Sequence, residues 1–121
     1  SEATSSSHPL EAFALAELSR NVLEDLKASD VVVLDVRSFG SIMDWLVIAS
    51  GTSNRHVRFL ARDVQDKAKQ RGARPLGVEG ENTGDWVLVD FGDVVVHVMQ
   101  PSARIFYDLE RLWAISPHGT E

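Results

Sequence analysis

The chain has 121 residues, of which 44% are hydrophobic and 25% charged, enough for one domain with a hydrophobic core but too short for two. Its formal net charge of −6 argues against general nucleic-acid binding, and we expect no direct DNA binding. The absence of cysteine excludes a disulfide framework and a thiolate metal site. The sequence has neither a membrane-length apolar run nor a secretory signal at its serine-rich start, so we expect a cytoplasmic protein without membrane contact.

The first half of the chain predicts a helix, two strands and a second helix. Residues 10–27 predict a helix whose inward stripe is Leu10, Phe13, Ala14, Leu18, Val22 and Leu26. The β-branched run 31–36 predicts a buried strand, and residues 44–50 predict another. Because the turn-like segment 38–41 is too short for a helical crossover, these strands should be antiparallel neighbours. Ser53 is placed to cap the next helix, which ends at Gly72 and faces inward through Val57, Leu60, Ala61, Val64 and Ala68.

The second half predicts three strands and a final helix. The strands span residues 76–79, 86–91 and 94–99, and Gly92-Asp93 forms a tight turn between the last two. The helix spans 103–113 and faces inward through Ile105, Phe106, Leu109, Leu112 and Trp113. This order predicts a single α/β domain, a mixed five-stranded sheet layered with helices, over residues 10–115, with flexible tails at 1–9 and 116–121.

The two strands between residues 86 and 99 alternate in an unusual way. One face of the pair is valine-rich and typical of a core. The other face, which we call the Trp86 face, consists of Trp86, Leu88, Asp90, Val95, His97 and Met99. A sheet packed on one side should be polar on the other, and a fully dry environment is costly for a carboxylate and a histidine. The alternative is that a helix covers this face as a third layer, but the mixture favours a partner surface anchored by Trp86.

Charge is distributed unevenly along the chain. Residues 53–74 contain seven basic and two acidic residues, a local charge of +5, which leaves −11 for the remainder. The acidic residues near the unusual strand pair are Glu79, Glu81, Asp85, Asp90 and Asp93. An acidic rim around apolar anchors favours a basic partner. The alternative is an ordinary solvated acidic surface.

Candidate catalytic groups are few. Asp90 should lie near His97 across the hairpin, where it could orient a general base, although such a pair is commonly a partly exposed cross-strand contact. The sequence has no nucleophile elbow, phosphate-binding glycine loop or dinucleotide fingerprint. Its four histidines lack the paired spacing of a metal site. We therefore predict no catalytic residue, cofactor or metal.

The turn that begins at Gly51 is a second candidate site. A strand, a Gly-Thr-Ser turn and a helix start carrying Ser53 and Arg55 could contact an anion or a polar partner. A nucleotidyl- or phosphoryl-transfer enzyme using residues 51–55 is the alternative function, but it would need paired acidic metal ligands, and Asp35 and Asp44 are single and separated by a loop. An ordinary helix cap explains the same residues.

Four segments closely resemble the Iojap-like ribosomal silencing factors. They are DWLVIASGTSNRHV (44–57), PLGVEGEN (75–82), DWVLVDFGDVVVHVM (85–99) and RIFYDLERLW (104–113), in the family's order within residues 10–113. The resemblance implies a fold related to nucleotidyltransferases without their catalytic residues. It also implies a homodimer that binds large-subunit ribosomal protein fourteen, blocks joining of the ribosomal subunits and represses translation under nutrient limitation. The family's contact region maps onto the segment with Trp86, and we extend it to Glu79, Leu88, Asp90, His97, Met99 and Tyr107. A third possibility is an adaptor that uses this face on another basic protein.

Overall fold

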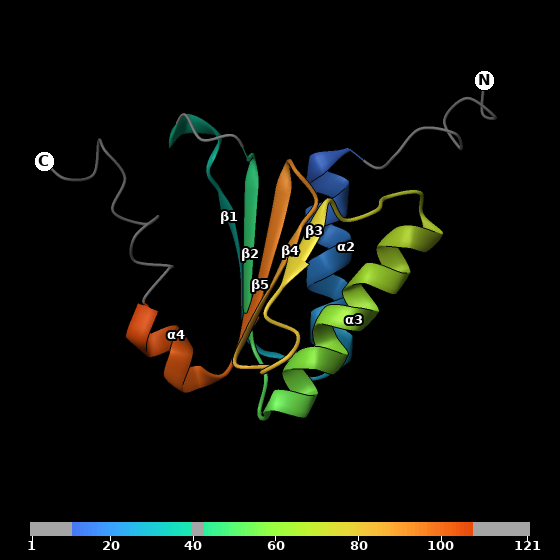
Figure 1. Ribbon diagram of the computed structural model, residues 1–121. Coiled ribbons are helices and arrows are strands. Elements are labelled where there is room, and N and C mark those ends of the chain that lie inside the picture. Colours follow the sequence, from blue (N-terminus) through green and yellow to red (C-terminus); the bar gives the residue numbers. More distant parts are fainter. Residues whose placement is uncertain (1–10, 40–42, 108–121) are drawn as a thin grey trace, which may run out of the picture.

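A computed structural model of the chain describes residues 11–39 and 43–107, without the side chains of residues 39 and 105–107. Three α-helices, five strands and a short 3-10 helix appear in this part of the chain (Figure 1). In chain order they are α2 (Ala12–Asp25), β1 (Ser29–Asp35), the 3-10 helix (Arg37–Phe39), β2 (Trp45–Ser50), α3 (Asn54–Gln70), β3 (Gly77–Glu79), β4 (Trp86–Asp90), β5 (Val94–Met99) and α4 (Pro101–Tyr107).

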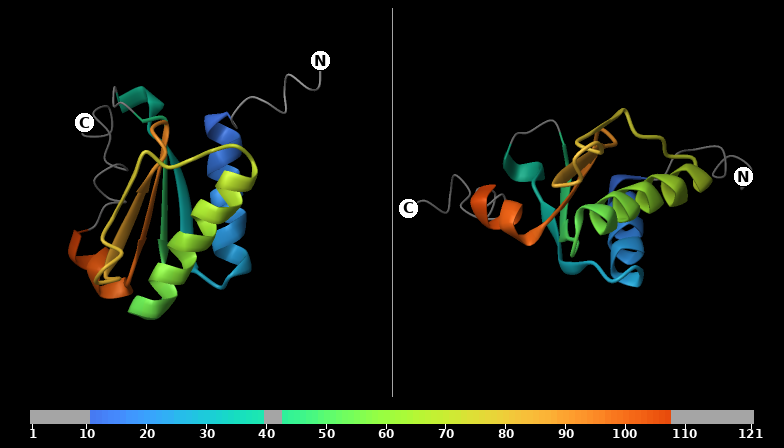
Figure 2. Two further views of the ribbon diagram at one scale, coloured as in Figure 1. Left: turned by 45° about the vertical axis from the view of Figure 1, so that its right-hand side comes forward. Right: turned by 60° about the horizontal axis from the view of Figure 1, so that its bottom comes forward.

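The five strands form one mixed sheet in the order β1-β2-β5-β4-β3, which confirms the predicted α/β architecture. β2 and β5 are parallel, and the other neighbouring pairs are antiparallel, including the predicted β1–β2 and β4–β5 pairs. Helices α2 and α3 cover one face of the sheet, and α4 lies on the other side (Figures 1 and 2). Among the described residues, two long helices cover one face of the sheet and the short α4 lies on the other side.

The main core lies between the sheet and the pair α2 and α3. The valines of β4 and β5 that were predicted to point one way are all buried there: Val87, Val89, Val94, Val96 and Val98. A smaller cluster on the other face consists of Val36, Leu46, Ile48 and Met99. The strand alternation thus produces two apolar clusters of unequal size.

The predicted inward stripe of the first helix is correct only in part. α2 buries Leu15, Ala16, Ser19, Val22 and Leu23, so Val22 is the predicted residue that is fully confirmed. Leu18 and Leu26 are half-buried against the core, Phe13 and Ala14 are exposed, and Leu10 lies outside the described residues. Phe13 is 54% exposed and packs its ring against Trp45, with the centroids 5.1 Å apart. The residues of this helix form two overlapping apolar stripes at helical spacing, the predicted one and the one that is buried. The buried stripe includes Ser19. Ser19 can be buried because its hydroxyl donates to the Leu15 carbonyl oxygen at 2.9 Å.

The prediction that β1 is a buried strand is also wrong. β1 lies at the edge of the sheet, and its residues are half-buried or exposed. The strand pairs with β2 along one edge only, and its four apolar residues are half-buried. β-branched residues suit such a half-buried strand, which explains the run in the sequence. Only Val36, just beyond the strand, is fully buried.

Helix α3 follows the prediction closely. Ser53 caps its first turn by accepting a hydrogen bond from the His56 amide at 3.0 Å. All five predicted inward residues are buried. The final helix begins two residues earlier than predicted, because Pro101 is compatible with a first helical turn. The predicted continuation of this helix, residues 108–113, lies outside the described residues, as do both predicted tails, 1–9 and 116–121.

Candidate protein-binding face

The strand register brings the predicted residues of the Trp86 face together. Trp86 lies opposite Met99 and Leu88 lies opposite His97 on the antiparallel pair β4–β5. Glu79 lies opposite Leu88 on the other side, so Glu79, Leu88 and His97 form one row across three strands. Cross-strand partners share a face, so this row runs from the acidic Glu79 at the edge of the sheet to His97 near its centre.

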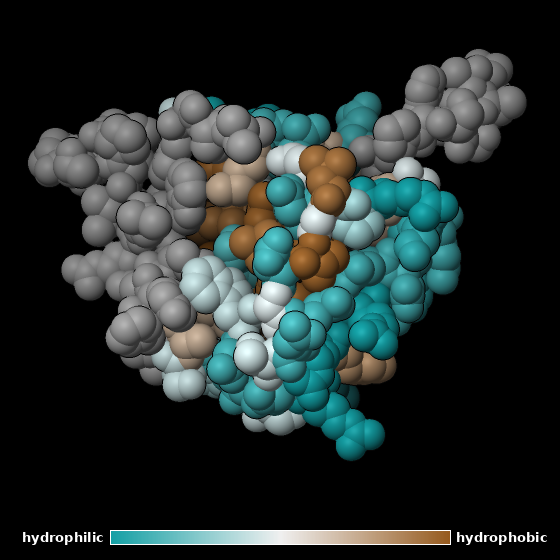
Figure 3. Space-filling model, viewed as in Figure 1, coloured by the Kyte–Doolittle hydropathy of each residue, from teal (hydrophilic) through white to brown (hydrophobic). Residues whose placement is uncertain are grey.

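These residues differ in depth. Glu79 is exposed, and Trp86, Leu88 and Asp90 are half-buried. His97 and Met99 are 8% and 0% exposed, so they form the floor of the face rather than its outer surface. In the space-filling view, hydrophobic residues gather over the strands between α3 and the side of the molecule that bears α4 (Figure 3). The more accessible residues of the face are therefore Glu79 on β3, Trp86, Leu88 and Asp90 on β4, and Val95 on β5.

Trp86 is held in place by His97. Its indole Nε1–H donates to His97 Nδ1 at 2.9 Å, and the two rings lie 5.7 Å apart at an interplanar angle of 39°. Burial lowers the pKa of His97 to about 4, so the ring is neutral at physiological pH. A neutral Nδ1 is what the indole needs as an acceptor. The histidine thus acts as a fixed support for the tryptophan.

The expected contact between Asp90 and His97 is wrong. His97 lies opposite Leu88, and Asp90 lies opposite Val95, two residues along the strand. Asp90 Oδ1 instead accepts a hydrogen bond from the Gly92 amide at 2.8 Å and so stabilises the β4–β5 turn. Within the described residues, no group of three histidine or acidic side chains could hold a metal ion.

The loop before β4 positions Trp86 and was not recognised as part of the site from the sequence. Gly80 has φ of +88°, and a Cβ there would lie 2.0 Å from the Trp86 carbonyl oxygen. The Asn54 side-chain amide donates to the Thr83 carbonyl oxygen and accepts from the Gln100 side chain. This network joins α3, the loop 80–85 and the start of α4. Asn54 follows the helix cap, and its position in the sequence gave no signal of this contact.

Arg104 is a second residue that sequence reasoning missed. Its side chain is 8% exposed, and Nη1 donates to Ser50 Oγ at 2.9 Å across 54 residues of sequence. Ser50 lies beside Met99 in the β2–β5 register, so Arg104 joins α4 to the floor of the Trp86 face. The predicted helix 103–113 also carries Asp108, Glu110 and Arg111, so the sequence gave no signal that set Arg104 apart. Tyr107 ends α4, but its side chain lies outside the described part of the chain.

The turn at Gly51 is organised as a helix cap with additional internal contacts. The Thr52 amide donates to His56 Nδ1 at 3.0 Å, and His56 Nε2 donates to the Leu26 carbonyl oxygen at 3.0 Å. The Thr52 amide is therefore already satisfied and unavailable to a phosphate. Arg55 is exposed. Asp35, one of the acidic residues weighed for metal binding, pairs with Arg37 at 2.7 Å, and these hydrogen bonds lower its pKa to about 2.

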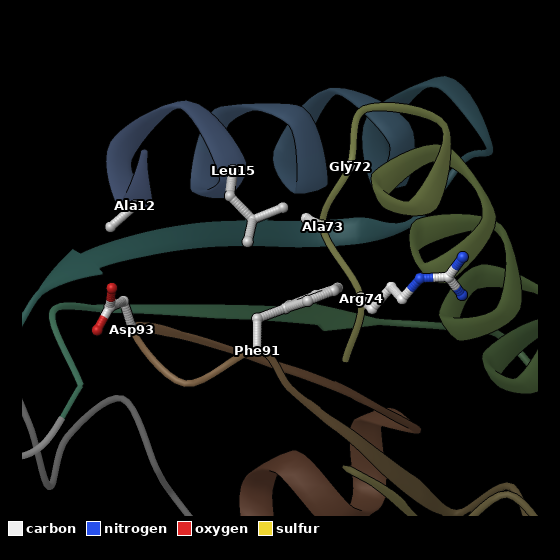
Figure 4. Close-up of a pocket in the computed structure, with 7 residues that line it drawn as sticks. All are labelled: Ala12, Leu15, Gly72, Ala73, Arg74, Phe91 and Asp93. Atoms are coloured by element: carbon white, nitrogen blue, oxygen red, sulfur yellow. The ribbon is translucent and has the colours of Figure 1, made fainter. Parts of the chain in front are cut away.

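A pocket of about 200 Å³ lies on the other side of the sheet, away from the Trp86 face. It opens between the start of α2, the segment after α3 and the β4–β5 turn (Figure 4). Its lining residues are Ala12, Leu15, Gly72, Ala73, Arg74, Phe91 and Asp93. No described helix has the length and hydropathy to cross a bilayer.

The fold and the Trp86 face together define a small α/β domain with a mixed sheet and an aromatic, acidic-edged face on the side away from its two long helices. The family model "Ribosomal silencing factor during starvation" matches residues 9–121. The chain belongs to this family.

Similar proteins agree with this assignment. The chain is 46% identical over 99 residues to the ribosomal silencing factor RsfS of Chromobacterium violaceum, covering 82% of this chain and 81% of that protein. It is 45% identical over 101 residues to the RsfS of Haemophilus influenzae, covering 84% of this chain and 99% of that one. A crystal structure of a Chromobacterium violaceum protein superposes with a TM-score of 0.84 at 45% identity, covering 87% and 88% of the two chains. The resemblance predicted from the sequence is therefore confirmed.

Proposed function

We propose that this chain binds large-subunit ribosomal protein fourteen through the Trp86 face and sterically blocks joining of the two ribosomal subunits, repressing translation under nutrient limitation. The observation that carries the proposal is the hydrogen bond from the indole Nε1 of the half-buried Trp86 to His97 Nδ1, 2.9 Å long. Glu79, on the same face, is exposed. A pre-oriented aromatic anchor loses little conformational entropy on binding. An acidic edge suits the basic surface typical of ribosomal proteins.

The mechanism requires occupancy and no bond-making step. A protein bound where the small subunit docks excludes that subunit by volume alone. We further propose that the protein acts in the cytoplasm and is a homodimer when free, as the family resemblance implies. Two observations support a mechanism without a bond-making step. Asp90 does not lie opposite His97 in the strand register, and the Thr52 amide already donates to His56.

The test is sedimentation of purified large and small subunits with and without the protein. The wild type should migrate with large subunits and lower the amount of joined ribosomes. Trp86→Ala should weaken large-subunit binding by about 30-fold or more, corresponding to a hot-spot loss of about 2 kcal/mol. Trp86→Phe keeps an aromatic ring but removes the indole donor, so it should retain an intermediate affinity.

Phe13→Ala is the matched control, because it removes a half-exposed aromatic ring from the opposite side of the sheet. It should bind large subunits as the wild type does. Each variant is first checked for folding by circular dichroism. A folded Trp86→Ala protein that still blocks joining would contradict the assigned face, and a wild type that does not bind large subunits would contradict the function. Joining that is inhibited only with ATP and Mg²⁺ present would favour the enzyme alternative.

A further inference from the structure

The outer side of α3 carries a stripe of positively charged side chains. Arg55, Arg58, Arg62 and Lys69 are spaced so that they fall within an arc of about 60° of the helix surface. The stripe is about 21 Å long, from the rise of 1.5 Å per residue. It lies away from the buried residues Val57, Leu60, Ala61, Val64 and Ala68. The space-filling view shows hydrophilic residues gathered over this helix (Figure 3).

In the part of the chain that the structure describes, the exposed cations of this stripe have no acidic partner within ion-pair distance. Arg55, Arg62 and Lys69 are exposed, and none of them forms an ion pair within residues 11–39 and 43–107. Asp66 lies on the same side of α3, one turn from Arg62 and Lys69, and pairs with neither. The basic residue of α3 that does pair is Lys67, which contacts Asp63 at 3.1 Å outside the stripe. Arg58 donates to the Thr83 carbonyl oxygen at 3.3 Å, a neutral acceptor that leaves its charge intact.

The stripe borders the loop that positions Trp86. Arg58 contacts Thr83, and Gln65 donates to Glu81 at 3.3 Å, so the first part and the middle of the loop 80–85 are attached to this side of α3. The loop then leads directly into β4 at Trp86. The basic stripe and the Trp86 face therefore flank the same loop, with opposite charge on its two sides. One large particle can contact both sides.

We propose that the α3 stripe binds the phosphate backbone of ribosomal RNA next to the protein that the Trp86 face contacts, an inference that rests on the proposed function. A line of three arginines and one lysine, with no ion pair among the described residues, matches a polyanion and not the basic protein expected at the Trp86 face, although the whole protein has a net charge of −6. Phe59, 52% exposed, lies on the same helix between Arg55 and Arg62 and offers a ring for a base or a sugar. The two contacts together fix the orientation of the protein, because phosphate contacts set register without reading sequence.

The test compares two triple variants with the same change in charge. Arg55→Gln, Arg62→Gln and Lys69→Gln remove three charges of the stripe, whereas Lys67→Gln, Arg71→Gln and Arg74→Gln remove three from the end and other side of the same segment. Binding to purified large subunits is measured between 50 and 200 mM salt, using fluorescently labelled protein. Binding to isolated large-subunit ribosomal protein fourteen is measured in parallel.

The stripe variant should lower the slope of log affinity against log salt by about 2 to 3, since each phosphate contact contributes about 0.7 to 0.9. Its deficit against the wild type should therefore be about 30-fold larger at 50 mM than at 200 mM salt. The control variant should keep the wild-type slope within about 1, and both should bind the isolated protein normally.

Several outcomes would overturn the inference. An unchanged slope for the stripe variant would exclude phosphate contacts by α3. If both triple variants changed the salt slope equally, the effect would come from the overall charge of the protein and not from the α3 stripe. Loss of binding to the isolated protein would assign the stripe to a protein contact. Failure of the wild type to bind large subunits would contradict the proposed function and the inference with it, whereas the first three outcomes leave the proposed function intact.

Discussion

Protonation of His97 should destabilise the fold and release Trp86 in mildly acidic solution. Its folded-state pKa of about 4 lies below the value of 6.5 for an unperturbed histidine, because burial disfavours the charged ring. The unfolded chain therefore binds a proton more readily than the native protein over this interval. Stability is fully present above pH 6.5 and falls as the pH drops from 6.5 to 4.

The magnitude follows from the two pKa values. Each unit of pKa difference corresponds to about 1.4 kcal/mol, so the full effect is about 3 kcal/mol below pH 4. At pH 5 the free energy of unfolding should be about 2 kcal/mol below its value at pH 8 from this residue alone. The charged groups nearest in the strand register are Asp90 and Glu79, and neither pairs with the His97 ring. Asp35 acts in a lower interval, since its pKa of about 2 affects stability only below about pH 4.

The assay is urea unfolding followed by far-UV circular dichroism at pH 8, 6 and 5, for the wild type and His97→Asn. The Asn oxygen can accept the indole N–H near the position of Nδ1 and does not titrate. Subtracting the two profiles removes the contribution of His56 and of the carboxylates, which both proteins share. The difference between wild type and variant should change by about 2 kcal/mol between pH 8 and 5. A constant difference over this range would refute the assignment of His97 as a buried neutral acceptor.

Substitutions at three further positions, Gly80, Ser53 and Ser50, test local contacts of the fold, each by urea unfolding. Gly80→Ala should lower the free energy of unfolding by more than about 2 kcal/mol, because its Cβ would lie 2.0 Å from the Trp86 carbonyl oxygen and φ is +88°. In the control Gly77→Ala the Cβ has no atom within 4 Å, so the free energy of unfolding should stay within about 0.5 kcal/mol of the wild type. Equal effects of the two glycine variants would contradict the described loop. Ser53→Ala should cost about 1 kcal/mol through loss of the cap bond to His56, and Ser53→Asp should restore most of it. Ser50→Ala should cost about 1 to 3 kcal/mol, because the buried Arg104 guanidinium loses an acceptor at 2.9 Å; no change would show that this bond contributes nothing.

The sequence alone predicted the direction of side chains in the regular elements. Strict alternation from Trp86 to Met99 separated the valine face from the Trp86 face, and the structure places the valines in the core. Helical spacing and a serine cap predicted α3 and its buried stripe. These features are local: a strand repeats every two residues and a helix every 3.6, so neighbouring residues suffice to predict them.

The tertiary structure decided depth and pairing. The parallel pairing of β2 with β5 places Ile48 beside His97, while Leu88 lies opposite it on β4, and the histidine is thereby buried and bonded to Trp86 rather than paired with Asp90. The edge position of β1, the exposure of Phe13 and the contact between Arg104 and Ser50 likewise depend on segments far apart in the sequence. A local pattern fixes which way a side chain points, but the free energy of burying it depends on what the rest of the chain brings against it.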